Sequence, residues 1–396
     1  GVLSHAIRYA LEDFVDYKYG RALRGAVHGV HRYIDEEGIK KRDTDPLDIE
    51  HIVVFDEAQR AWSKEHLIKK KTSSRYAESH IDPSILDSEP TLMLNTLNRV
   101  GNWAVLVALV GNGQEIWKGE AGLSEWGHAL SSQKNKWTVH CPPCFTTGNA
   151  ENAEYALFKS RQSLTTLPHA IVEKGILHLN TSIRSLRSLR HNEWVDAVLQ
   201  LDPDTARSAR DTSAPFELYL TRSISAAKAF GKRRASRGET IGLLANFDAK
   251  FLRRIGIEVG KGFRDEIRFA HWFNEDIDCA QSCRHLEIAA TPIECQGLDL
   301  DHSIVIWGED MLPREGEQQW HHRKAHGGRM QNDNNPESQR NRVNCYRVLL
   351  TRARRSMIIV VPPPPDVRIK GCAGLASRFE DLFNQLLRAG AALLPE

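Results

Sequence analysis

Short apolar runs rich in valine, isoleucine and leucine recur along the chain, and longer charged stretches with helical periodicity separate them. The runs that have the length and composition of buried strands are residues 51–55, 104–110, 241–245, 286–290, 303–307 and 357–361. Continuous apolar strands that alternate with helices are typical of a parallel sheet covered by helices on both faces. The pattern therefore predicts an α/β protein.

The length of 396 residues exceeds that of one ordinary core and predicts two lobes. The strand signal fades after Cys141 and a polar helical stretch follows, so we expect lobes of residues 1–170 and 171–396. Residues 313–344 are rich in Gln, Asn, His, Arg and Gly. This composition predicts a surface loop or a partly disordered insertion between two strands.

The composition, with 41% hydrophobic and 26% charged residues, is that of a soluble globular protein. The longest apolar run is too short for a membrane span and no signal peptide is present, so we expect a cytoplasmic protein without membrane contact. The odd number of cysteines, 7, fits a reducing compartment. Cys141 and Cys144 have metal-ligand spacing, but the wider spacing of Cys279 and Cys283 favours free thiols over a zinc site.

The net charge of +2 does not by itself indicate a nucleic-acid-binding protein, so any such site has to come from local clusters. Four basic clusters occur, at residues 69–71, 184–190, 232–234 and 352–355. Each is either a nucleic-acid contact or a solvated face.

Two carboxylates, Asp56 and Glu57, come directly after the first apolar run, in the segment VVFDEAQ. Functional side chains of parallel α/β sheets lie at the carboxyl ends of strands. Phosphoryl transfer needs one group there to hold Mg²⁺ and one to polarise the attacking water. The pair is therefore a candidate hydrolytic site, although strands also end in Asp-Glu by chance.

The second run continues into the turn LVGNGQEI. Gly111 and Gly113 allow the backbone to come close to a ligand, and Gln114 offers a neutral amide that can sense a phosphate. An ordinary strand-to-helix turn has the same features.

Two segments present arginines. Arg184, in LNTSIRS, lies on a helix face that is either solvated or an anion site. Arg352, in YRVLLTRARR, either stabilises the charge on a γ-phosphate or lies as a cation at a helix end.

The remaining segment runs from Thr291 through ECQGLDLD. Thr291 and Gln296 could meet a backbone phosphate, Gly297 allows close approach, and Asp299 could accept from a ribose hydroxyl. The alternative is a plain helix breaker between two strands.

In this order the five segments resemble motifs II, III, IV, V and VI of superfamily 1 helicases. The stretches KGEAG with Trp126 after motif III, and VIWG after motif V, are similar to the Schlafen-like helicase domain. The resemblance covers about residues 45–362. It implies two RecA-like lobes of a P-loop NTPase, with ATP in the cleft between them and a strand of DNA or RNA across their tops.

The resemblance also implies a role for each matching residue of the first lobe. Asp56 would hold Mg²⁺ and Glu57 would be the catalytic base for water. Gln59 and Gln114 would contact the γ-phosphate region, and Gly111 would lie near the nucleotide.

For the second lobe, the resemblance implies that Arg184 and Arg352 complete the catalytic site. Positions near the nucleotide would be Gln296, Gly297 and Asp299, and positions that contact nucleic acid would be Thr291 and Thr351. Hydrolysis would open and close the cleft and move the lobes along a single strand.

The sequence departs from the family pattern because it contains no G-x-x-x-x-G-K-[ST] loop to cradle phosphates. Residues 256–262 are one residue short of that motif and end in Gly. Residue 1 is Gly, and Ser4 begins a stretch with helical spacing, so we expect a fragment cut after the loop that alone neither binds ATP tightly nor hydrolyses it. Asn112 also replaces the Asp usual in motif III.

Two other functions stay open. The first is a catalytically inactive nucleic-acid-binding or regulatory module on a helicase scaffold. The second is a nucleotide-dependent oxidoreductase, which the lack of a G-x-G-x-x-G segment after an early strand disfavours.

Overall fold

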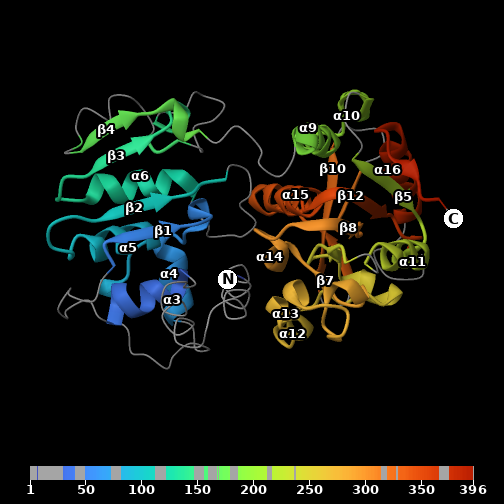
Figure 1. Cartoon of the computed structure of the whole chain (residues 1–396), viewed down its shortest axis with the longest axis horizontal. Helices are drawn as coiled ribbons and strands as arrows, with labels where there is room; N and C mark the ends of the chain where they lie inside the picture. The colour runs from blue at the N-terminus through green and yellow to red at the C-terminus, as the bar shows by residue number, and fades with distance from the viewer. Residues whose placement is uncertain are drawn as a thin grey trace. The chain divides into compact units, whose positions relative to one another are not determined.

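A computed structural model describes most of the chain, which divides into two compact units (Figure 1). One unit is His28–Thr181 and the other contains Ser182–Glu396, and each is described by itself. The described residues are 7, 30–40, 50–72, 82–111, 122–146, 156–158, 167, 169–178, 186–211, 216–235, 238–313, 319–326, 329–364 and 374–395.

The first unit contains two pairs of parallel strands and the helices that pack on them. Its strands are β1 (Ile52–Phe55), β2 (Val105–Ala108), β3 (Thr138–Cys141) and β4 (Ala170–Glu173). Its helices are α3 (Val30–Tyr33), η1 (Ile34–Lys40), η3 (Ala58–Arg60), α4 (Lys64–Thr72), η4 (Pro83–Ile85), α5 (Glu89–Leu97), α6 (Gly122–Ser132), α7 (Pro143–Thr146) and η6 (Gly175–Leu177).

The core of the first unit lies between the β1–β2 pair and the helices α5 and α6. Helix α5 begins where the Ser88 hydroxyl accepts from the backbone N–H of Thr91, and its apolar side chains are buried. Strand side chains alternate, so Phe55 faces the core while Ile52 and Val54 on the other face are 57% and 62% exposed. The β1–β2 pair is therefore covered on one face.

The second unit is built on a parallel sheet of six strands in the order β13-β5-β12-β8-β6-β7. These strands are β5 (Glu217–Thr221), β6 (Ile241–Ala245), β7 (Ala289–Ala290), β8 (Leu300–Ile306), β12 (Ala353–Val360) and β13 (Ala392–Leu393). The surrounding helices are α9 (Leu186–Leu199), α10 (Pro203–Asp211), α11 (Ile224–Ala235), η7 (Lys250–Ile255), α12 (Lys261–Asp265), α13 (Phe269–Asn274), η8 (Cys283–His285), α14 (Pro292–Cys295), α15 (Pro336–Leu350) and α16 (Leu375–Arg388).

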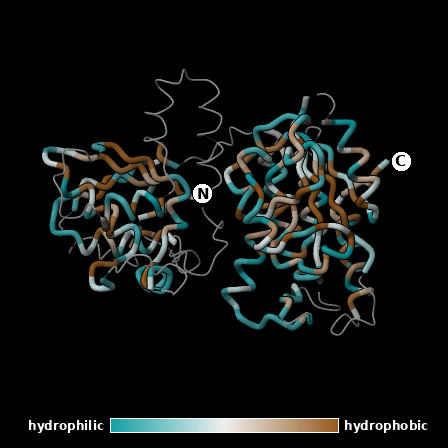
Figure 2. Tube along the Cα trace, turned by 90° about the horizontal axis from the view of Figure 1, so that it is seen from below, coloured by the Kyte–Doolittle hydropathy of each residue, from teal (hydrophilic) through white to brown (hydrophobic). Residues whose placement is uncertain are grey.

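Helices cover both faces of this sheet. Successive residues of β6 point to opposite faces, and Ile241 meets α11 at Gly231 whereas Gly242 meets Trp272 of α13. Figure 2 shows the hydrophobic segments of the second unit running through its interior. The predicted α/β class with a mostly parallel sheet is confirmed.

The expectation of a loop or disordered insertion over residues 313–344 is wrong. The described part of this stretch contains β10 (Trp320–His326) and β11 (Arg329–Asn332), which form an antiparallel sheet with β9 (Met311–Pro313). Most of α15 follows. The polar composition predicted exposed side chains, but Asp333 and Arg342 are buried and form a hydrogen bond with each other.

Other differences concern the limits of elements. The predicted strand 286–290 is reduced to β7, since Leu286 adopts a left-handed conformation with φ 59° after η8. None of the predicted strands corresponds to β3, β4, β5 or β13. The units divide at Thr181, after β4. The predicted first helix from Ser4 lies outside the described residues except for Ile7. Among the described helices, none combines the length and apolarity needed to span a bilayer.

Gly242 offers a test of the packing on this face. A Cβ there would lie 2.7 Å from Cη2 of Trp272, a side chain that is fully buried and held by its bond to the Ile288 carbonyl. We expect Gly242→Ala to lower the free energy of unfolding by about 1–3 kcal/mol in urea denaturation. The matched control Gly262→Ala, where no described neighbour lies within 4 Å, should cost less. Equal costs would contradict this packing.

Candidate functional site

The carboxyl ends of β1 and β2 lie side by side in the first unit. Phe55 pairs with Ala108, and the Leu109 N–H donates to the Phe55 carbonyl at 2.9 Å. The chain after β1 then returns, because the Ala58 N–H donates to the Leu109 carbonyl at 2.8 Å. The segments of motifs II and III therefore meet at one end of the strand pair.

A buried amide joins the two strand ends. Gln59, only 1% exposed, donates from Nε2 to Oε2 of Glu57 at 2.6 Å, and its Oε1 accepts from the Gly111 N–H at 2.9 Å. Both ends of the amide are thus engaged, which fixes its orientation. The indole of Trp126 donates to the Ala58 carbonyl at 2.8 Å and holds the same turn.

The two carboxylates of this turn differ in setting. Asp56 is exposed, and its Oδ1 accepts from the Glu57 N–H at 3.0 Å. Glu57 is half-buried and has φ 54° and ψ 42°, a left-handed conformation that costs a non-glycine residue free energy. Backbone strain of this kind is concentrated at functional sites. Exposed carboxylate oxygen is also the ligand type that Mg²⁺ prefers, so Asp56 fits the predicted metal role chemically.

Two predicted site residues, Gln114 and Arg184, lie outside the described residues, as does Asn112. Their roles stay predictions. Within the described part of the chain, no group of three or more His, Cys, Asp or Glu side chains is arranged to hold a metal ion.

In the second unit, Thr291 is the N-cap residue of α14. Its hydroxyl and N–H both donate to Oε2 of Glu294, and Arg264 donates to the other carboxylate oxygen of Glu294. Thr291 is fully buried. The threonine predicted to meet nucleic acid thus serves here as a helix cap.

The segments of motifs V and VI lie together. The Leu300 N–H donates to the Arg352 carbonyl at 3.0 Å, where β8 and β12 begin their pairing. Gly297 has φ 81°, which turns the chain between the buried Gln296 and strand β8. Asp299 accepts from Arg354 at 3.2 Å. The structure therefore brings Gln296, Gly297 and Asp299 next to motif VI.

Arg352 itself is directed inward. It is 2% exposed and donates to the carbonyls of Val348 at 2.9 Å and Leu298 at 3.3 Å and to Oγ1 of Thr351 at 3.1 Å. A guanidinium in this position satisfies the end of α15 and ties it to the motif V segment. To meet a phosphate, it would have to leave these carbonyls, so that role stays a prediction.

A buried charge network holds α15 on the sheet. Arg342 donates to Asp248 at 3.0 Å and to Asp333 at 2.9 Å, and it lies 3.6 Å from Asp310. Asp310 also accepts from the Tyr346 hydroxyl at 2.8 Å and from Asn246 at 2.7 Å. Sequence reasoning missed this network because its members are far apart along the chain.

The carboxylates of this region have shifted pKa values. Burial and then the charge of Asp310 raise the pKa of Glu309 to about 7. Burial raises the pKa of Asp310 to about 6, against the influence of Arg342. For Asp333, burial acts upward but the bonds from Ser338 and Arg342 outweigh it and hold the pKa at about 2.

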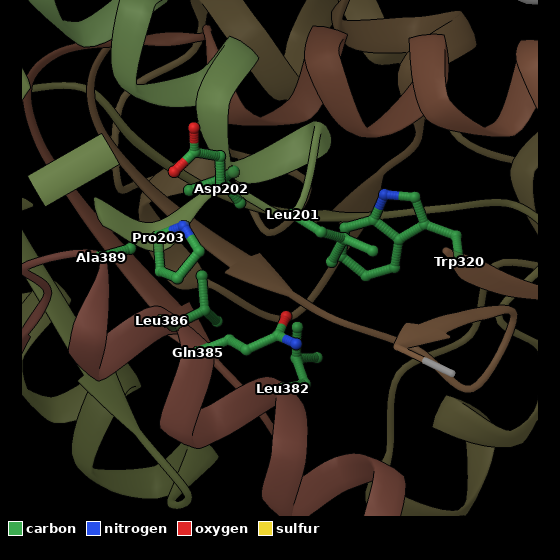
Figure 3. A pocket seen from close by; sticks show the side chains of 9 residues that line it. Leu201, Asp202, Pro203, Trp320, Leu382, Gln385, Leu386 and Ala389 are labelled. Carbon is green, nitrogen blue, oxygen red and sulfur yellow. The ribbon is translucent and has the colours of Figure 1, made fainter. Parts of the chain in front are cut away.

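The second unit also has a small, mainly apolar hollow between α10, β10 and α16 (Figure 3). Leu201, Pro203, Trp320, Leu382 and Leu386 are among its lining residues. None of the predicted site residues lines it.

Residues 2–363 match the family model described as Schlafen group 3, DNA/RNA helicase domain. The chain belongs to this family. No curated protein sequence matches it. The family match covers both units and all five motif segments, so the resemblance to Schlafen-like helicases is confirmed at the level of the family.

The strain at Glu57 can be measured with two variants that both lack the carboxylate. We expect Glu57→Gly to be more stable to unfolding than Glu57→Ala by about 1 kcal/mol, because only glycine adopts φ 54° without cost. Thermal or urea denaturation gives the difference. If the alanine variant is equally stable, the left-handed conformation is not held in solution.

The pKa of Glu309 predicts a pH dependence. Because its folded pKa is raised, its contribution to stability is present below pH 4.5 and is lost as the pH rises through about 7. Glu309→Gln keeps the acceptor for the Phe251 N–H and removes the titration. We expect the loss of unfolding free energy between pH 5 and 8 to shrink by up to about 3 kcal/mol. Glu266→Gln, at an exposed position, should leave the profile unchanged.

Proposed function

We propose that this domain is the ATPase core of a DNA or RNA helicase or single-strand translocase. The observation that carries the proposal is the hydrogen-bonded chain Glu57–Gln59–Gly111 at the carboxyl ends of β1 and β2. It supports the proposal because a carboxylate and an amide lie at the end of the strands where parallel α/β sheets bind ligands. The family match supports DNA or RNA as the partner.

In the first unit, Asp56 would hold Mg²⁺, which when bound neutralises charge on the phosphates. Glu57 would accept the proton of the attacking water, and Gln59 would orient Glu57 through the bond they share. Gln59 also accepts from the Gly111 N–H, so a shift of the chain after β2 would move Gln59 and with it the Glu57 carboxylate. Such a connection suits a site whose geometry must change with the bound nucleotide.

In the second unit, we propose that the segment 296–299 and the motif VI arginines act together on nucleotide and nucleic acid. Arg352 would leave the carbonyls of Val348 and Leu298 when an anion competes for its guanidinium. Because the Val348 carbonyl belongs to the end of α15, this exchange of acceptors would couple phosphate binding to the conformation of that helix end. We further propose that both units are RecA-like lobes.

One observation favours a second candidate function. The 396 residues contain no phosphate-cradling loop, which fits a nucleic-acid-binding or regulatory module without catalysis on the same scaffold. The intact Asp56, Glu57 and Arg352 favour the ATPase.

The ATPase proposal is tested with Glu57→Gln, which keeps size and hydrogen bonding but removes the base. Mg²⁺-dependent ATP hydrolysis is measured with and without single-stranded DNA and RNA, on this chain and on any longer product of its gene that contains a phosphate loop. We expect stimulated turnover in the form with the loop and a loss of at least about 100-fold in Glu57→Gln.

Binding of nucleic acid without hydrolysis in every form would favour the inactive module instead. Robust hydrolysis by the 396 residues alone, abolished in Glu57→Gln, would show that the cradle is not required.

A further inference from the structure

A short basic helix, η7, follows the carboxyl end of strand β6 in the second unit. The chain turns after β6, where the Ala249 N–H donates to the Asn246 carbonyl at 3.1 Å, and η7 begins at the next residue. Its sequence, KFLRRI, contains three cations and no carboxylate. Ligands of parallel α/β sheets bind at the carboxyl ends of strands. Cations are therefore concentrated at a strand end where ligands bind, in a helix outside the four basic clusters of the sequence.

The helix η7 presents its polar side chains outward. Side chains three positions apart are eclipsed in a 3-10 helix, so η7 has three rows of two residues. One row, Leu252 and Ile255, packs against the core beneath the sheet, and Leu252 is only 3% exposed. The other two rows lie on the opposite side of the helix and contain Lys250, Arg253, Phe251 and Arg254. All three cations are exposed.

An aromatic ring supports one of these cations. The Arg254 guanidinium lies over the Phe251 ring, at 4.7 Å from its centroid. The Phe251 N–H donates to Oε1 of the buried Glu309 at 2.8 Å, which fixes the backbone beneath the ring. A guanidinium held in this way is a flat cationic surface, on which a base can stack. The surface is thus positioned before any ligand arrives.

The carboxylates nearest to η7 in the sequence bind other groups. Glu258 pairs with Arg253 at 3.1 Å, and Asp248 accepts from the buried arginine of α15 at 3.0 Å. Within the part of the chain that the structure describes, no carboxylate lies at ion-pair distance from Lys250 or Arg254. These two cations are therefore open to an anionic ligand.

We propose that the η7 face, defined as Lys250, Phe251 and Arg254, binds single-stranded nucleic acid. Lys250 contacts a backbone phosphate, and a base stacks on the guanidinium that Phe251 supports. A basic face that serves only to be solvated needs no aromatic support for its arginine. The inference rests on the proposed function and adds a contact site outside the five helicase motifs.

The test uses two substitutions on η7 and a control on α11. Lys250→Ala removes a charge, whereas Arg254→Lys keeps the charge and removes the planar group. Lys232→Ala, at a lysine 3.6 Å from Glu287, makes the same change in net charge as Lys250→Ala. Binding of a fluorescent oligothymidylate and an oligouridylate is measured by anisotropy over a range of salt concentrations, without ATP. Circular dichroism and the melting temperature confirm that each variant is folded.

We expect Lys250→Ala to weaken binding roughly fivefold and to reduce the slope of log K against log salt by about 0.7, for one phosphate contact on a single strand. Arg254→Lys should weaken binding by at least about fivefold without changing that slope, because it removes stacking and no charge. Lys232→Ala should retain the affinity and the slope of the unmodified protein.

Unchanged binding in either η7 variant, or an equal loss in Lys232→Ala, would overturn the proposal. A lack of binding of both oligonucleotides by the unmodified protein would overturn it as well. The assay uses no ATP, so failure of the ATPase proposal would appear only in the Glu57→Gln experiment.

Discussion

The parallel pairing of β1 with β2 is the constraint on which the candidate site depends. Parallel strands in register end at the same edge, so residues 56–59 and Gly111 are neighbours although 52 residues of sequence separate Gln59 from Gly111. One buried amide, that of Gln59, then converts this proximity into a fixed geometry. The strained backbone of Glu57 is sustained by these surroundings.

In the second unit, strand pairing also brings two motif segments together, and a guanidinium instead of an amide joins them. Pairing of β8 with β12 brings motif V to motif VI, and Arg352 then bonds backbone carbonyls from both. At the opposite ends of the strands, Arg342 binds carboxylates that follow β6 and β8. Helix α15 is thus held by two buried guanidinium groups, one at its middle and one just beyond its C-terminal end.

The sequence allowed strands β6, β7, β8 and β12 of the main sheet to be predicted, but not β5, β13 or the β9–β11 sheet. Strand β6 was predicted with its observed limits because all five of its residues are buried and apolar or glycine. Strand β10, WHHRKAH, has no such pattern. Its register is set by pairing with β9 and β11, and its buried polar side chains depend on partners that are distant in the sequence. Asp56 and Glu57 were predicted to follow a strand, and they lie directly after β1. The inward direction of Arg352 and the Arg342 network arise from tertiary packing that no local pattern records.

The position of Asp333 has a consequence for anyone who wishes to shorten this domain. The β9–β11 sheet is polar, as is typical of an insertion that can be removed. Asp333, the residue directly after β11, is nevertheless one of the carboxylates that neutralise Arg342. Excision of the sheet alone would leave a buried cation short of an acceptor, at a cost of several kcal/mol. A minimal version would need Arg342 and Asp310 replaced together by apolar residues that fill the same space.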